Sequence, residues 1–196
     1  MDPLLSICLG IGLAAACGFR VFVPFLALSV AASSGHVALS PGFEWIGTEA
    51  ALIAFLVAAF VEILAYEIPW LDHLLDVIAA PAAVIAGVLL TASAAAGVDP
   101  FLRWSLALIA GGGVAATVQG ATSLARATST FGTAGLANPL LALVESGTAV
   151  AVAMAALFVP VLTALAVGIA LLVVARWLVR RSRRRPPVSN ASPGPS

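Results

Sequence analysis

The chain has 196 residues, of which 62% are hydrophobic and 9% are charged, and its mean hydropathy is +1.12. An ordinary soluble domain is about 45–50% apolar and about 25% charged, so the composition excludes one and predicts a chain embedded in lipid. The net charge is zero, but six of the nine basic residues, all arginine, lie between Arg176 and Arg185. This basic end predicts a cytoplasmic C-terminus in contact with phospholipid headgroups, and no nucleic-acid partner is expected.

The first apolar run, residues 3–32, predicts a membrane helix that is kinked or broken. It has 30 residues, which is too long for one straight span of about 20 and too short for two. Gly18 and Pro24 lie in its middle, and a proline removes a backbone donor from a helix. Two ordinary spans follow, at residues 48–66 and 77–96.

The second part of the chain predicts three further spans. Residues 101–130 form another run of 30 residues, interrupted by several glycines. Residues 140–177 form an apolar run of 38 residues with Glu145 as its only acid. That run would measure roughly 57 Å as one helix, nearly twice the hydrocarbon core, so we expect two spans that meet at Pro160.

A repeated pattern of small residues indicates that the two parts are related. Each copy has the i, i+4, i+8 spacing of one helix face and is followed by an arginine, Arg20 or Arg126. The copies are Gly10, Ala14 and Gly18 in the first part, and Gly112, Ala116 and Gly120 in the second. We therefore expect the first and fourth spans to be broken, near Gly18 and Gly120.

The expected fold is all-α: a polytopic helical membrane protein with about six spans in two repeats. Because each repeat has three spans, the second must be inverted relative to the first. The repeats comprise residues 1–97 and 98–180, and residues 181–196 form a disordered basic and Pro/Ser-rich tail. An even number of spans puts both termini in the cytoplasm, with the protein in the cytoplasmic membrane.

Two arginines are the first candidates for a binding site. Arg20 lies roughly 25 Å along the first helix, where it either snorkels to the far interface or faces inward to bind an anion or a buried acid. Arg126 belongs to a polar stripe at helical period, which alternatively serves ordinary helix packing. The stripe consists of Gln119, Thr122, Ser123, Arg126 and Thr130.

A group of acids follows the second span and has three interpretations. It is an acidic interfacial loop, a set of partners for the two arginines, or a cation or proton site. The spacing matches no metal motif, so the metal question stays open. The acids are Glu62, which lies within the second span, and the cluster Glu67, Asp72 and Asp76.

The opening stretch GIGLAAACGFRVF, residues 10–22, is similar to the opening of the bacterial membrane family catalogued as domain of unknown function 4126. Glu67 departs from the family pattern, in which a basic residue is expected in many members. The resemblance covers nearly the whole chain and implies an integral membrane protein, but it supplies no substrate. It is also carried by Pro41-Gly42-Phe43, by Ile68-Pro69 with Asp72 and Asp76, and by Asn138-Pro139.

The inverted repeat favours a small transporter or channel whose site lies between the repeats and is lined by Arg20, Arg126, Glu62 and the polar stripe. A small anion or ion is the expected substrate, and membrane lipids are expected partners. The alternative is a membrane scaffold or lipid-binding protein in a larger assembly. Enzymatic activity and a cofactor are not expected. Six spans make only a thin wall around a transport pathway, which favours a homodimer.

Overall fold

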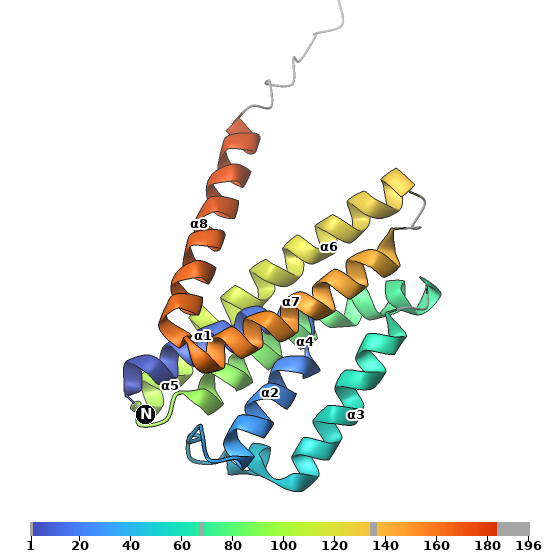
Figure 1. Ribbon diagram of the computed structural model, residues 1–196. Coiled ribbons are helices and arrows are strands. Elements are labelled where there is room, and N and C mark those ends of the chain that lie inside the picture. The colour runs from blue at the N-terminus through green and yellow to red at the C-terminus, as the bar shows by residue number, and fades with distance from the viewer. Residues whose placement is uncertain (1, 67–68, 134–136, 184–196) are drawn as a thin grey trace, which may run out of the picture.

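The computed structural model describes residues 2–66, 69–133 and 137–183. For residues 69–77, 177–179 and 181–183 it describes the backbone only. Every regular element in these ranges is a helix (Figure 1). The first part contains α1 (Pro3–Cys17), α2 (Phe22–Ser33), the 3₁₀ helix η1 (Glu44–Gly47), α3 (Glu49–Ala65) and α4 (Pro69–Ala94). The second contains α5 (Pro100–Leu106), the π-helical segment η2 (Ala107–Gly112), α6 (Gly113–Thr133), α7 (Asn138–Phe158) and α8 (Pro160–Arg183).

The break predicted in the first apolar run is present. Helix α1 begins with Pro3 behind the Asp2 cap, whose carboxylate accepts from the Leu4 N–H, and it ends at Cys17. Helix α2 begins at Phe22, so Pro24 lies in its first turn. A proline is tolerated there because first-turn N–H groups have no partner within the helix.

The break predicted near Gly120 is wrong. Residues Pro100–Thr133 form one continuous helix of 34 residues, and Gly120 lies inside α6. A single glycine weakens a helix by only about 1 kcal/mol, and no proline follows it, so nothing forces a break there. The irregularity lies earlier, at η2, where Gly87 and Gly111 bring the backbones of α4 and η2 together. A Cβ on Gly87 would lie 2.8 Å from the Gly111 carbonyl oxygen.

Two other helix boundaries test the predicted spans. Helix α7 ends at Phe158 and α8 begins at Pro160, so the predicted separation of the last two spans is confirmed. Helix α4 begins at Pro69, earlier than the predicted start at residue 77. An interfacial loop was one of three interpretations of the acids before residue 77, and the backbone of Asp72 and Asp76 is instead helical, because a proline is well suited to the first position of a helix.

Helix α1 is at the centre of the packing, in contact with α4, α6, α7 and α8. Its small residues allow close approach, because a Cβ on Gly12 would lie 2.6 Å from the Ala156 Cβ of α7. Helices α2 and α3 lie side by side, as do α6 and α7, while the far end of α8 stands away from α6 (Figure 1).

Two helices in the described part are long and apolar enough to cross a membrane: Pro100–Thr133, with mean hydropathy 1.5, and Asn138–Phe158, with 2.0. Only 28% and 33% of their apolar windows are buried in the molecule, so most of this surface faces outward. Exposed Leu, Ile, Val and Phe side chains also cover α3 and α8. Length and composition therefore support a helical membrane protein.

Candidate functional site

Arg20 lies in the short segment between α1 and α2, and its side chain is 1% exposed. Its Nε donates to the Ser146 Oγ at 3.0 Å, and its Nη2 donates to the Ala142 carbonyl oxygen at 2.9 Å. Both acceptors belong to α7. The side chain therefore faces inward, in place of snorkelling, and ties the break in the first part of the chain to a helix of the second.

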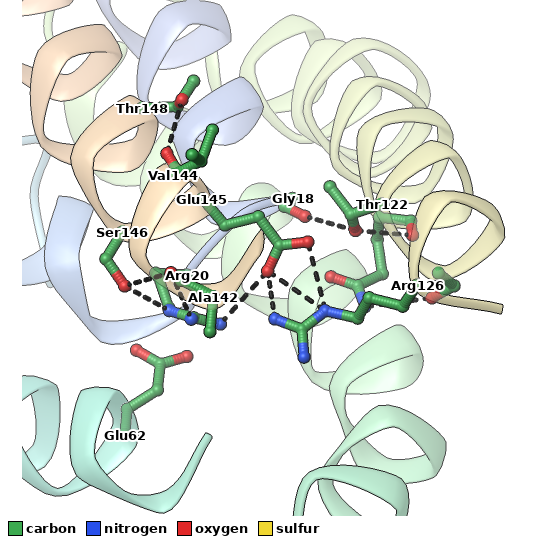
Figure 2. Close-up of polar contacts among 12 residues, drawn as sticks. Gly18, Arg20, Glu62, Thr122, Arg126, Ala142, Val144, Glu145, Ser146 and Thr148 are labelled. Carbon is green, nitrogen blue, oxygen red and sulfur yellow. Dashed lines mark hydrogen bonds and ion pairs between the residues drawn. The ribbon is translucent and has the colours of Figure 1, made fainter. Parts of the chain in front are cut away.

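Arg126 lies on α6, is 4% exposed, and meets the same buried carboxylate as Arg20 (Figure 2). Its Nε donates to both Glu145 oxygens at 3.1 Å, and its Nη2 pairs with Oε2. The Arg20 Nη1 lies 3.5 Å from that same Oε2. One carboxylate on α7 thus bridges two arginines from different elements, which is how buried charges are stabilised.

Tyr66, which follows α3 directly, completes the cluster. Its ring centroid lies 4.0 Å from the Arg20 Cζ and 4.4 Å from the Arg126 Cζ. An aromatic face attracts a guanidinium group electrostatically, and more strongly where water is excluded. We call Arg20, Arg126, Glu145 and Tyr66 the arginine cluster.

Glu62, on α3, interacts electrostatically with Arg20 and also has a second role that the sequence did not predict. Its carboxylate oxygens accept from the backbone N–H groups of Val21 at 2.7 Å and Phe22 at 3.0 Å. These are free donors at the start of α2, and a carboxylate there also interacts favourably with the helix dipole. Glu62 therefore stabilises the break beside Arg20.

The predicted polar stripe on α6 divides between two faces. The Thr122 Oγ1 donates to the Gln119 carbonyl at 2.9 Å and lies 3.4 Å from the Gly18 carbonyl in the break. Gln119 and Ser123 lie 3.4 Å apart through their side chains and line a separate cavity of about 330 Å³ between α4 and α6. Thr122 and Arg126 adjoin the break or the cluster through their side chains, and the Thr130 Oγ1 donates to the Arg126 carbonyl at 3.0 Å.

The small residues expected to pack do so unevenly. Gly10 and Gly112 both face α4, where an added Cβ would lie 2.9 Å from the Thr91 Cα and 3.0 Å from a Val88 methyl. Gly18 lies against α6, where an added Cβ would lie 2.9 Å from the Gln119 N and closer still to Val118. No described atom of another element lies within 4 Å of a Cβ added to Gly120, so Gly120 makes no close packing contact in the described part of the chain.

The acidic cluster can be tested only in part. Glu67 lies outside the described residues, and so do the side chains of Asp72 and Asp76, whose backbone belongs to α4. Among the residues that are described, no group of three His, Cys, Asp or Glu side chains could hold a metal ion.

A groove of about 860 Å³ lies beside the arginine cluster, between α6, α7 and α8, with α1 contributing to its wall. Among the described residues, its lining consists of Ala, Val, Leu, Phe and Thr side chains and one charged residue, Glu145. Thr122 also faces it, whereas neither Arg20 nor Arg126 belongs to the lining. Glu145 therefore stands at the junction between the groove and the two arginines.

Sequence reasoning missed Glu145 and Tyr66 as members of the site. The available signal for Glu145 was its position as the single acid in the apolar run 140–177. A buried acid in such a run needs a partner, and the buried arginines were the natural candidates. Tyr66 had no comparable signal, because its role depends on where α3 ends in space.

These features define an all-helical protein with outward-facing apolar helices and a buried arginine–glutamate–arginine cluster. Residues 7–181 match the model of the family described as Domain of unknown function (DUF4126), and the chain belongs to this family. The resemblance drawn from the opening stretch and the shorter motifs is thereby confirmed. No curated protein and no solved structure matches the chain.

Proposed function

We propose that the protein is a multi-span membrane protein that binds a small anionic solute at the arginine cluster and moves it between its two halves. The observation that carries this proposal is the convergence of Arg20 and Arg126 on the single Glu145 carboxylate. The proposed architecture is six spans in two inverted repeats, with both termini cytoplasmic.

The cost of burying two arginines supports a functional role. A charged side chain at bilayer depth costs about 2.5–3.5 kcal/mol on insertion scales, and apolar residues of similar volume would pack the same space without that cost. Arg20 and Arg126 are nevertheless almost fully buried. Ionisable residues inside a membrane commonly mark a solute or ion path.

Arg20 also keeps a donor available for a ligand. Its Nη1 is buried and makes no hydrogen bond among the described residues, although Glu145 Oε2 lies 3.5 Å away. This ion pair is longer than a good hydrogen bond, so an incoming oxyanion closer to Nη1 would gain a charge-assisted hydrogen bond there.

The position of the cluster supports coupling between the halves. Arg20 comes from the break in the first half, and its hydrogen-bond acceptors Ser146 and Ala142 lie on α7 of the second. A solute that replaced these contacts would change how the halves are held together, which is the requirement for alternating access.

A membrane scaffold is the second candidate. The same contacts from Arg20 to Ser146 and Ala142 would act as a permanent clasp between the halves. In that case the cluster neutralises its own charges and no solute enters.

Flux in proteoliposomes separates the two candidates. The wild type is tested with acetate, phosphate and chloride, together with Arg20→Gln, Arg126→Gln and the control Arg103→Gln on α5. Losing one charged hydrogen-bonding group from a binding site costs about 1.5–3 kcal/mol, so each cluster variant should lose at least about tenfold in flux. Transport of a small anion is refuted if the wild type moves none of these anions, or if both folded cluster variants match it.

A further inference from the structure

We propose that the anionic solute is an amphiphile: a carboxylate that carries an apolar chain, with its head at the arginine cluster and its chain in the groove between α6, α7 and α8. This inference rests on the proposed function, because it assigns a chemical class to the solute at the same site.

The groove has the size and chemistry of a site for an apolar chain. Ligand pockets typically measure about 300–1,000 Å³ and are mostly apolar with a few placed polar groups. This one measures about 860 Å³, and its lining contains a single charged residue, Glu145. A small inorganic anion would have no use for so large an apolar surface.

The position of Glu145 identifies the head group. Glu145 belongs to the lining of the groove, and its carboxylate lies between the Arg20 and Arg126 guanidinium groups (Figure 2). The site therefore already holds a carboxylate in the place where the ligand head would bind. The ligand head and Glu145 compete for the same two guanidinium groups, and Glu145 closes the cluster when the groove is empty.

The arrangement of α8 provides a route for the chain. The first part of α8 contacts α1 and α7, and the rest of the helix stands apart from α6 (Figure 1). Its outward side carries large apolar residues such as Leu165, Ile169 and Leu172, each more than half exposed. A chain dissolved in the bilayer would thus reach the groove sideways, between α6 and α8, without crossing water.

Binding of labelled palmitate to the protein in nanodiscs, corrected for empty nanodiscs, tests the inference. Palmitate should bind the wild type, and Arg20→Gln and Arg126→Gln should each bind it at least about tenfold more weakly. Hexadecanol, which has the chain without the charge, should compete at least about tenfold less well. Glu145→Gln should bind palmitate about tenfold more tightly, because the competing charge is gone.

Groove-filling variants test the position of the chain. Ala166→Trp on α8 and Ala125→Trp on α6 place a large ring in the lining and should weaken palmitate binding at least about tenfold. The control Leu165→Trp is one residue away on α8 but outside the lining, and it should bind palmitate as the wild type does. Two independent helices keep the test valid if one variant fails to fold.

The outcomes distinguish this inference from the proposed function. Arginine-dependent acetate flux without palmitate binding overturns the amphiphile and leaves the transporter intact. Arginine-dependent palmitate binding without any flux supports the amphiphile site and overturns transport. Palmitate binding that is equal in all variants overturns the inference, as does a second copy of the chain cross-linked within the groove.

Discussion

The two long apolar runs carry the same small-residue pattern but fold differently. The first breaks between Cys17 and Phe22, whereas the second passes through the matching region around Gly120 as continuous helix. Its irregularity is the π-helical segment Ala107–Gly112, which stays within the helix. Each nevertheless supplies one arginine to the same Glu145 carboxylate.

The difference shows what a helix break inside an apolar bundle requires. In the first run, Pro24 favours a helix start and the Glu62 carboxylate accepts from two free N–H groups. The second run has no proline between Gly113 and Thr133. Glycines permit a break without requiring one. The helix therefore continues, because a break would leave backbone groups unsatisfied, which costs several kcal/mol in lipid.

The largest expected effect comes from removing the carboxylate that joins the two runs. Glu145→Ala leaves two buried guanidinium groups without that anion and should lower the free energy of unfolding by about 3–5 kcal/mol. Thermal unfolding in detergent measures the change. Glu49→Ala, at the exposed start of α3, should cost no more than about 1 kcal/mol, and equal losses in both variants would contradict the account.

Replacing the last glycine of each pattern by alanine should change the free energy of unfolding in opposite directions. Gly18→Ala places a Cβ against Val118 and Gln119 and should destabilise the protein by about 1–3 kcal/mol. The Cβ of Gly120→Ala meets no atom of the described neighbouring elements, and this exchange should stabilise the protein by up to about 1 kcal/mol through helix propensity alone. The same unfolding assay measures both, and a loss at Gly120 equal to that at Gly18 would mean that the second run also packs tightly there.

The cap on the break should contribute less than the carboxylate bridge. Glu62→Ala removes the acceptor for the Val21 and Phe22 N–H groups and should cost about 1–2 kcal/mol. Hydrogen exchange should also speed up at the start of α2 and stay unchanged in α6. Unchanged exchange at Val21 and Phe22 would show that the carboxylate is not needed there.

The smallest effect is expected at the proline of the first run. Pro24→Ala should destabilise the protein by about 0.4–1 kcal/mol, because the proline is compatible with the first turn of α2 and restricts the unfolded chain. Equilibrium unfolding of the two proteins side by side provides the measurement. An increase in stability would indicate that Pro24 strains the turn.

The sequence predicted local features of the fold better than the distant contacts. Gly18 with Pro24 indicated the first break and Pro160 the last one, because a proline acts on the backbone beside it. The break predicted at Gly120 was wrong, because glycine permits a break in a helix without requiring one. The six-span inverted repeat stays a prediction.

The candidate site was predicted in part for the same reason. The arginines were identified because buried charges stand out in an apolar run. Their shared partner, Glu145, lies 125 positions from Arg20 along the chain, and only the packing of α7 against the break brings the two together. Tyr66 and the groove depend on the angles between helices, which no local pattern encodes.

The central claim is that Arg20 and Arg126 hold an anion in the place of Glu145. The most direct test is to measure how much a bound ligand raises the free energy of unfolding. Palmitate at about 100 times its dissociation constant should stabilise the detergent-solubilised wild type by about 2.7 kcal/mol. Arg20→Gln and Arg126→Gln, which bind at least about tenfold more weakly, should lose at least about half of that gain, while Arg103→Gln keeps it. The same stabilisation in all four proteins, or none in the wild type, would contradict the account.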